Sequence, residues 1–362
     1  MSFPSKGRSV LILGGAGFIG SNWADYLLTK TDADIHIFDN LSRRKVEHNL
    51  QWLKSRPGAA SRLNVSVADI RDARAVAKAV YGATEIYHFA AQVAVTTSLA
   101  DPRHDFEVNA GGTLNILEAA RQSGNRPFLL FTSTNKVYGK LGAADAGGLL
   151  VARRVTAESQ PLDFYSPYGC SKGTADQYVR DYARIFRIPT VVFRMSCIAG
   201  PRQFGNEDQG WIAHFVYSAL QRRSISIYGD GHQVRDVLAV RDLVRAFAAA
   251  YENHKTTAGQ VYNIGGGAEN TISLLELIKT MEAVLRMPVR YRFRPARPGD
   301  QPIYVTDFSK FHQHTQWAPQ RSLLQTVHDI WRWYEENQSL FLPAPFSVPA
   351  GKLPEAVREI AS

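Results

Sequence analysis

The sequence contains little cysteine: Cys170 and Cys197 are the only two in a chain of 362 residues. Two cysteines cannot form the disulfide framework of a small secreted protein, so we expect a reducing compartment, the cytoplasm. No run of about 18 apolar residues is present, which argues against a transmembrane helix and a membrane partner. Residues 1–8 lead directly into an apolar segment and lack the apolar core of a signal peptide.

The charge balance is basic, but the basic residues are dispersed. Lys and Arg total 42 against 33 Asp and Glu, which gives a formal net charge of +9. A nucleic-acid-binding protein would concentrate such charge in a tract or a recognisable module, and the sequence has neither. We therefore expect no nucleic-acid partner. A phosphorylated small substrate and ordinary surface charge explain the excess more simply.

Apolar segments of strand length alternate with segments of helical spacing along the first half of the chain. Strands are expected at 9–13, 34–38, 63–67, 85–89, 127–131 and 190–193, and helices at 21–30, 71–81, 102–122 and 167–186. This alternation predicts an α/β fold with a doubly wound parallel sheet of the Rossmann type. Ligands of such folds bind at the carboxyl ends of the strands, so the functional residues are expected there.

A glycine-rich turn follows the first predicted strand. Gly14, Gly17 and Gly20 permit a tight turn, close approach of the backbone to a pyrophosphate, and close packing of helix on strand. Asp39 closes the second predicted strand 19 residues after Gly20. A carboxylate at that point accepts hydrogen bonds from the adenosine ribose and repels a 2′-phosphate, which favours NAD over NADP. Arg43 and Arg44 lie nearby, and we interpret them as residues of a solvated loop.

Tyr168 and Lys172 are four residues apart on a predicted helix, so their side chains project from one face. Ser166 is expected to cap this helix and Pro167 to be its first residue. An ammonium beside the phenol, together with the positive end of the helix, would lower the pKa of Tyr168 and make it a proton acceptor near neutral pH. Alone this pair is weak support for catalysis, because exposed helices carry such pairs by chance.

Several further motifs occur in a fixed order around this pair. They are Gly14-x-x-Gly17-x-x-Gly20, residues 88–92, Asn109, residues 133–139, Tyr168-x-x-x-Lys172, residues 234–237, residues 262–266 and residues 297–300. Together they resemble the extended short-chain dehydrogenase/reductase family, most members of which remodel nucleotide-sugars. The resemblance covers roughly residues 8–338.

The resemblance implies a set of catalytic and cofactor-binding residues. Thr134 would hydrogen-bond the reacting oxygen, Tyr168 would be the acid/base and Lys172 its activator, while NAD accepts the hydride. The implied contacts to NAD are Gly14, Gly17, Phe18, Ile19, Gly20, Asp39, Asn40, Asp69, Ile70, Ala90, Gln92, Asn109, Tyr168 and Lys172. We expect no metal ion.

The residues after Thr134 indicate which reaction follows the oxidation. Dehydratases of the family carry an acidic residue there, whereas this chain has Asn135 and Lys136. An amide and an amine do not supply the acid/base pair for loss of water, so we predict epimerisation. Residues 133–139, 166–173, 202–211 and 92–98 are similar to the group of 2-epimerases that act on CDP-paratose. This similarity implies inversion at carbon 2 of a CDP-hexose or CDP-deoxyhexose.

The remaining part of the chain is expected to bind the substrate. By the same resemblance, the contacts to a nucleotide-diphosphate sugar are Thr97, Asn135, Lys136, Gln209, Trp211, Arg235 and Arg297. We predict an NAD-binding Rossmann domain at 1–196, joined by 233–267. A smaller, discontinuous α/β substrate-binding lobe is predicted at 197–232 and 268–340, followed by a Pro-rich tail at 341–362. A homo-oligomer, a dimer or tetramer, is expected.

Two alternatives stay open. The same residues could epimerise carbon 4 of a UDP- or CDP-hexose, and the fold also occurs in non-catalytic, NAD-binding sensors. Sensors commonly lack the Tyr and Lys pair that this chain keeps. The chain departs from the family at Cys197 and Ala199, where an Asn and a Tyr are usual, and this removes polar contacts near the substrate. We do not expect Cys197 to be a catalytic thiol.

Overall fold

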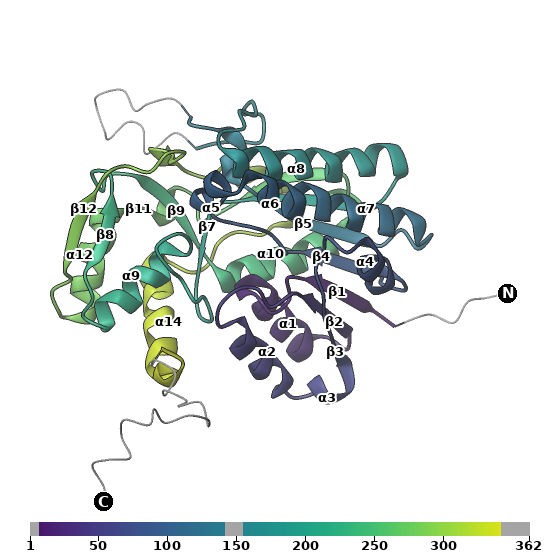
Figure 1. Ribbon diagram of the computed structural model, residues 1–362, viewed down its shortest axis with the longest axis horizontal. Coiled ribbons are helices and arrows are strands. Elements are labelled where there is room, and N and C mark those ends of the chain that lie inside the picture. The colour runs from purple at the N-terminus through teal and green to yellow at the C-terminus, as the bar shows by residue number, and fades with distance from the viewer. Residues whose placement is uncertain (1–6, 142–154, 342–362) are drawn as a thin grey trace, which may run out of the picture.

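The computed structural model describes residues 7–141 and 155–341. The predicted Pro-rich tail therefore lies outside the described residues, apart from Phe341. Helices and strands below keep the labels of Figure 1.

A parallel sheet forms the centre of the larger lobe. Within the described residues it has seven strands in the order β10-β6-β5-β4-β1-β2-β3, and every neighbouring pair is parallel. The strands are β1 (Ser9–Leu13), β2 (Asp34–Asp39), β3 (Leu63–Val67), β4 (Glu85–His88), β5 (Phe128–Thr134), β6 (Thr190–Met195) and β10 (Gln260–Ile264). This order reverses direction at β1, which confirms the predicted doubly wound Rossmann sheet.

Helices cover both faces of this sheet (Figure 1). On β1, Val10 and Ile12 pack into one apolar cluster, while Leu11 and Leu13 pack into another. This alternation follows from the period of two along a strand and explains why the strands are apolar throughout. The first cluster takes side chains from α1 (Phe18–Lys30), α2 (Val46–Lys54) and α10 (Val240–Glu252), and the second from α4 (Ala73–Val80), α7 (Gly112–Gln122) and α8 (Pro167–Phe186).

The predicted helix at 102–122 is interrupted in the structure. It consists of α6 (Pro102–Phe106), a π-helical turn η1 (Glu107–Gly111) and α7. Such π-turns occur frequently at functional sites. Shorter helices complete this lobe: α3 (Ala59–Arg62), α5 (Val95–Ala100), the 3₁₀ turn η2 (Asn135–Tyr138) and α11 (His254–Thr257).

A smaller lobe lies beyond the carboxyl ends of the strands, at the left of Figure 1. In the described part of the chain, β9 (Val234–Ala239) pairs with β7 (Cys197–Ala199), β11 (Thr271–Ser273) and β13 (Ile303–Tyr304). A second small sheet joins β8 (Ile225–Tyr228) to β12 (Tyr291–Arg294). The helices are α9 (Trp211–Leu220), α12 (Leu274–Leu285) and α14 (Leu323–Glu336), with 3₁₀ turns η4 (Ala268–Asn270) and η5 (Gln338–Phe341).

The chain crosses between the lobes more than once. After β9 it returns to the large sheet as α10 and the edge strand β10, and α13 (Ser309–Thr315) packs Phe311 into the core beside β10. Segments distant in sequence therefore meet between the lobes, at the carboxyl ends of β4, β5 and β6. The domain boundaries given above stay a prediction.

Candidate active site

A cavity of about 380 Å³ lies between the large sheet and the smaller lobe. The sheet side contributes Phe18, Ile19, Thr134, Tyr168 and Lys172. The lobe side contributes Cys197, Gln209, Trp211, Arg235, Arg297 and Asp300. Its position, at the carboxyl ends of parallel strands, is the one predicted for ligand binding in a doubly wound fold.

The glycine-rich turn leaves its backbone accessible at the start of α1. Gly17 precedes the helix and no side chain caps the first turn, so the amide groups there can bind an anion. Gly14 has a φ of +80°, and a Cβ at this position would lie 2.6 Å from the Ala90 nitrogen. A Cβ at Gly20 would lie 2.4 Å from the Gly14 oxygen. The sequence thus needs glycine at both positions, and the turn fits a dinucleotide phosphate.

Asp39 holds this turn in place. Its carboxylate accepts hydrogen bonds from the Ala16 N–H, at 3.0 Å, and the Leu41 N–H, at 2.9 Å. Burial raises the pKa of the Asp39 carboxyl, while these backbone bonds oppose the rise. The Gly17 N–H also donates to this carboxylate, so three of its four lone-pair sites are used and one is left for the predicted ribose contact.

The next predicted cofactor residues continue along the same edge of the sheet. The Asn40 amide donates to Asp69 at 2.9 Å, and Arg71 pairs with the same carboxylate at 3.0 Å. The hydrogen bond from Arg71 is the main reason that the pKa of Asp69 lies well below its usual range. Ile70 is buried next to Gly112 at the start of α7, where a Cβ would lie 2.5 Å from Ile70. These contacts order the edge on which an adenosine would lie.

Gln92 and Asn109 are held in a network that sequence reasoning did not find. Asn109 accepts from the Gln92 N–H and donates to its carbonyl, both at 3.0 Å, and also donates to Ser171 at 3.1 Å. Asp105 accepts from Gln92 at 2.9 Å and from Ser171. The network braces the first turn of α8 against the π-turn η1. The sequence offered one signal of this network, because Ser171 lies between Tyr168 and Lys172.

The start of α8 is as predicted. Ser166 caps the helix by accepting from the Gly169 N–H at 3.2 Å, and Pro167 occupies the first turn. The Tyr168 N–H donates to Ser98 at 3.1 Å, which fixes this turn on α5. Tyr168 and Lys172 both line the cavity, and the Thr134 side chain hydrogen-bonds the Tyr168 phenol. Thr134 is the last residue of β5, which extends three residues beyond the predicted strand end. The three predicted catalytic residues are therefore brought together.

The predicted electrostatics of this pair are wrong for this structure. Burial raises the pKa of Tyr168 to about 12, with only a partial opposing effect of the Thr134 hydrogen bond. Burial also lowers the pKa of Lys172 to about 7. The Lys172 ammonium donates to the Thr132 carbonyl at 2.7 Å and lies 4.1 Å from the centre of the Phe131 ring. Desolvation of both groups therefore outweighs the expected stabilisation of a phenolate.

Asn135 and Lys136 begin the short turn η2 and line the cavity. The Asn135 amide donates to Gln301 at 3.3 Å. The Lys136 amine donates to the Gly299 carbonyl at 3.3 Å and lies 3.6 Å from Asp300. Burial, followed by the charge of Arg235, lowers the pKa of Lys136 to about 8. The sequence alone could not indicate this shift, because its causes lie about a hundred residues or more along the chain.

The smaller lobe contributes two arginines to the cavity. Arg235 is buried and donates to Asp300 at 2.7 Å. Arg297 donates to the Glu207 carbonyl at 2.8 Å, lies 3.6 Å from Asp208, and stacks 3.6 Å from the centre of the Tyr228 ring. Both predicted anion-binding residues are therefore at the cavity.

The other substrate-binding predictions have mixed outcomes. Gln209 and Trp211 line the cavity, and the Trp211 indole N–H contacts Cys197 Sγ at 3.4 Å. Thr97 is exposed and is not among the residues that line the cavity; its neighbour Thr96 lines it and donates to Asp208 at 2.9 Å. The structure therefore places Thr96, and not the predicted Thr97, at the cavity, because the two neighbours project from different faces of α5.

Arg43 and Cys197 can also be compared with the sequence-based expectations. We interpreted Arg43 as a residue of a solvated loop; it is exposed in a bend before α2, and its guanidinium also donates to Gln209 of the opposite lobe. Burial raises the pKa of the Cys197 thiol, which keeps the sulfur protonated and agrees with the expectation that it is no nucleophile.

Among the residues that the structure describes, no helix is long and apolar enough to cross a membrane. The same residues contain no group of three or more His, Cys, Asp or Glu side chains arranged to hold a metal ion.

The sequence is similar to those of known proteins. The family model for GDP-mannose 4,6 dehydratase matches residues 11–330. The chain is 41% identical over 339 residues to a CDP-paratose 2-epimerase from Salmonella typhi, which covers 90% of this chain and 98% of the relative.

Solved structures give the same fold. A dTDP-glucose 4,6-dehydratase from Streptomyces venezuelae with NAD bound has a TM-score of 0.81 at 29% identity, covering 92% of this chain and 98% of the other. A UDP-glucuronic acid 4-epimerase from Bacillus cereus, in complex with UDP-glucuronic acid and NAD, has a TM-score of 0.80 at 26% identity. It covers 91% of this chain and 99% of its own.

Proposed function

Because the chain belongs to the GDP-mannose 4,6-dehydratase family of nucleotide-sugar epimerases and dehydratases, we propose that it is an NAD-dependent epimerase. Its substrate is a CDP-hexose or CDP-deoxyhexose, which it inverts at carbon 2 through a transient 2-keto sugar. One observation carries this proposal: the two residues that follow Thr134 into the cavity are Asn135 and Lys136, which have no carboxyl group. The 41% identity to a CDP-paratose 2-epimerase supports the same carbon.

The glycine-rich turn fits NAD because its backbone stays accessible to the pyrophosphate. The uncapped start of α1 would hold the pyrophosphate, and Asp39 the adenosine ribose. Phe18, Ile19, Tyr168 and Lys172 lie where the reactive end of the cofactor would meet the sugar. The bound oxidised cofactor supplies the hydride acceptor and a positive charge on its ring.

The protein side chains handle the proton. The Thr134 hydroxyl orients the sugar oxygen, and Tyr168 takes the proton of the carbon-2 hydroxyl and later returns it. Because burial raises the pKa of Tyr168 to about 12, a nearby positive charge is needed before the phenol can act as a base near neutral pH. Lys172 holds its ammonium against the Thr132 carbonyl, which places a titratable group one helical turn from the phenol.

The substrate nucleotide is assigned to the smaller lobe. We assign the diphosphate to Arg235 and Arg297, whose guanidinium groups suit phosphate oxygens. In the predicted division residues 1–196 with 233–267 bind NAD, and residues 197–232 with 268–340 bind the sugar nucleotide; Arg235 is an exception, because β9 pairs with strands of the smaller lobe. Anchoring the diphosphate on one lobe while the keto sugar turns would present its opposite face to the same hydride donor. A cytoplasmic location and a homo-oligomeric state stay predictions.

Product analysis tests the proposal directly. Purified protein is incubated with NAD and, separately, CDP-paratose, CDP-glucose and UDP-glucose, and the products are read by NMR. Inversion at carbon 2 of a CDP sugar is the expected result. Inversion at carbon 4 would overturn the assigned carbon, and NAD binding without turnover of any sugar would favour the sensor. Tyr168→Phe is the inactive control, and the exposed Tyr178→Phe on the same helix is its match.

A further inference from the structure

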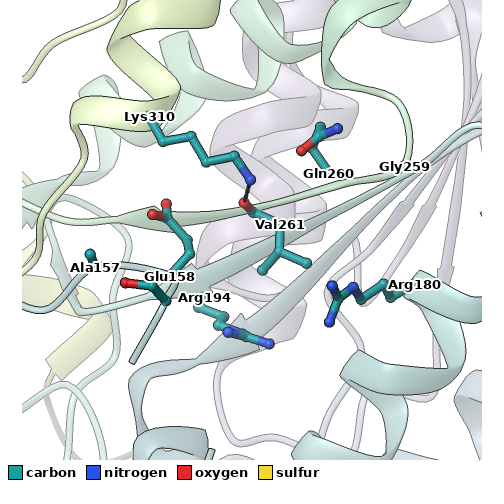
Figure 2. A pocket seen from close by; sticks show the side chains of 9 residues that line it. Ala157, Glu158, Arg180, Arg194, Gly259, Gln260, Val261 and Lys310 are labelled. Atoms are coloured by element: carbon teal, nitrogen blue, oxygen red, sulfur yellow. Dashed lines mark hydrogen bonds between the residues drawn. The ribbon is translucent and has the colours of Figure 1, made fainter. Parts of the chain in front are cut away.

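A second cavity is lined by Arg180, in the carboxyl-terminal half of α8 (Figure 2). Its volume is about 390 Å³, close to that of the catalytic cavity. None of the residues that line it also lines the catalytic cavity. Its walls come from α8, β6, the edge strand β10, α13 and the segment before α8, through residues Ala157, Glu158, Ser159, Arg180, Arg194, Gly259, Gln260, Val261 and Lys310.

Three cationic side chains from three elements meet in this cavity. Arg180 comes from α8, Arg194 from β6 and Lys310 from α13, and in Figure 2 the guanidinium ends of the two arginines turn toward one another. The charges are close enough that Arg194 lowers the pKa of Arg180, although burial is the larger cause. Burial likewise lowers the pKa of Lys310. Such a concentration of like charge requires compensation.

The compensation within the described residues is incomplete. Arg194 is neutralised by Asp176, at 2.8 Å, and also donates to the Tyr138 hydroxyl at 3.0 Å. Lys310 donates to the Val261 carbonyl at 2.9 Å and contacts the Tyr262 ring, but neither group is charged. The Arg180 side chain makes no hydrogen bond or ion pair with another described residue, although the charge of Asp176 raises its pKa.

Glu158 is the single carboxylate that lines this cavity among the described residues. Its Oε1 accepts from the Asn263 N–H at 2.7 Å, and burial raises the pKa of its carboxyl. The residues that line the cavity carry three positive charges and one negative charge, while Asp176, outside the lining, pairs with Arg194 and also raises the pKa of Arg180. The cavity is therefore built to attract an anion.

We infer that this cavity binds a small phosphorylated molecule, with Arg180 and Lys310 holding its phosphoryl group. A guanidinium fork and an ammonium on separate walls suit the several oxygens of a phosphoryl group, which carries more charge than a single carboxylate. The Ser159 hydroxyl, from the segment before α8, adds a hydrogen-bond donor to the lining. The volume exceeds that of a phosphate ion and lies in the range of small-molecule sites, so the rest of the molecule fits beside Ala157 and Val261.

Variants of the cavity residues should change the affinity for phosphate in opposite directions. Replacing a cation should weaken phosphate binding, whereas removing the competing carboxylate should strengthen it. Arg180→Gln is a mild change, because the Arg180 side chain has no hydrogen bond or ion pair with a described residue to lose. In Glu158→Gln the side-chain oxygen can still accept from the Asn263 N–H, so the local structure is kept. A purely structural role for these residues would not produce opposite changes in affinity.

The experiment measures binding of inorganic phosphate to the NAD-loaded full chain by calorimetry, at fixed ionic strength. We expect Arg180→Gln and Lys310→Gln each to weaken binding by about tenfold and Glu158→Gln to strengthen it by about threefold. Arg297→Gln should remove only phosphate bound in the catalytic cavity and keep the binding that depends on Arg180 and Lys310. Arg292→Gln, on the exposed strand β12, is the control and should leave both unchanged. Acetate is the second probe and should bind more weakly than phosphate.

Several results would overturn the inference. Phosphate binding that is lost in Arg297→Gln and kept in Arg180→Gln would place the anion in the catalytic cavity. No measurable phosphate binding to the unmodified protein would remove the site. Acetate binding as tightly as phosphate would contradict the phosphoryl assignment. The unfolding temperature and NAD content of each variant show whether it has folded, and Glu158→Gln still tests the site if a cation variant does not.

Discussion

The two sides of the catalytic cavity use their polar groups in different ways. On the sheet side, Tyr168 and Lys172 form no ion pair with a described residue. Burial outweighs the charge of Arg43 on Tyr168 and those of Asp176 and Asp105 on Lys172, so the pKa of each moves toward its neutral form. On the lobe side the charges are paired: Arg235 with Asp300, and Arg297 with Asp208. The difference suggests a division of work. The sheet side is suited to move a proton, and the lobe side to exchange its carboxylates for the phosphates of a ligand.

The largest expected effect is at the phenol of the sheet side. Tyr168→Phe removes the group that carries the proton and should lower kcat by at least about a thousandfold, while NAD stays bound. Steady-state kinetics and the NAD content of the purified protein measure the two effects. Tyr178→Phe alters an exposed phenol on the same helix and should leave kcat unchanged. A Tyr168→Phe variant with nearly full activity would contradict the assigned role.

The next largest effect is expected on the lobe side and should appear in KM. Arg297→Gln removes a charge-assisted contact to the diphosphate, worth roughly 1.5–3 kcal/mol, so KM for the nucleotide-sugar should rise by about ten- to a hundredfold. The value of kcat should change much less. Arg292→Gln, on the exposed strand β12, is the matched control. If kcat fell and KM did not, the comparison between the two sides would be reversed.

Burial of Lys172 should also be visible in the pH dependence of stability. Its pKa is about 7 in the folded protein, below the roughly 10.4 of an unfolded lysine, so the unfolded state binds the proton first as pH falls. Its contribution to the free energy of unfolding therefore rises from pH 7 to 9, by about 2 kcal/mol. Urea titrations of the unmodified protein and Lys172→Met at both pH values measure this. Equal pH dependence in the two proteins would refute the lowered pKa.

The smallest expected effect on activity is in the hydrogen-bond network of Asp105, Asn109 and Ser171. Ser171→Ala removes the hydroxyl that bonds Asp105 and Asn109 and should lower the free energy of unfolding by about 1–2 kcal/mol. Activity should fall far less than in Tyr168→Phe, because the network positions α8 without touching the sugar. Chemical denaturation measures the free energy of unfolding. Ser55→Ala, at an exposed serine at the end of α2, is the control. A drop in activity as large as that of Tyr168→Phe would make Ser171 part of the chemistry.

Features set by local sequence were predicted well. The Gly14 turn, the Ser166 cap and the i, i+4 pair of Tyr168 and Lys172 depend on neighbours within a few residues, and the structure confirms their placement. The parallel sheet followed from apolar segments of strand length, since buried strands are apolar on both faces.

Features set by distant contacts were not predicted. The lowered pKa of Lys136 arises where a turn after β5 meets Arg235 and Asp300. The contact of Arg43 with Gln209 joins positions 166 residues apart, and no local pattern indicates it. The helix expected at 102–122 has uninterrupted helical spacing, and a π-turn of one extra residue leaves no clear mark on that spacing.

The order of strands in the large sheet has a consequence for synthesis of the chain. Strands β1 to β6 are complete once residue 195 has emerged, whereas their neighbour β10 begins at residue 260. At 5–20 residues per second, roughly 3–13 s pass before β10 can cover β6. During that interval β6 is an open edge that can pair with another chain. The nascent protein therefore has a defined window in which a chaperone, or a slower translation rate, would change its yield.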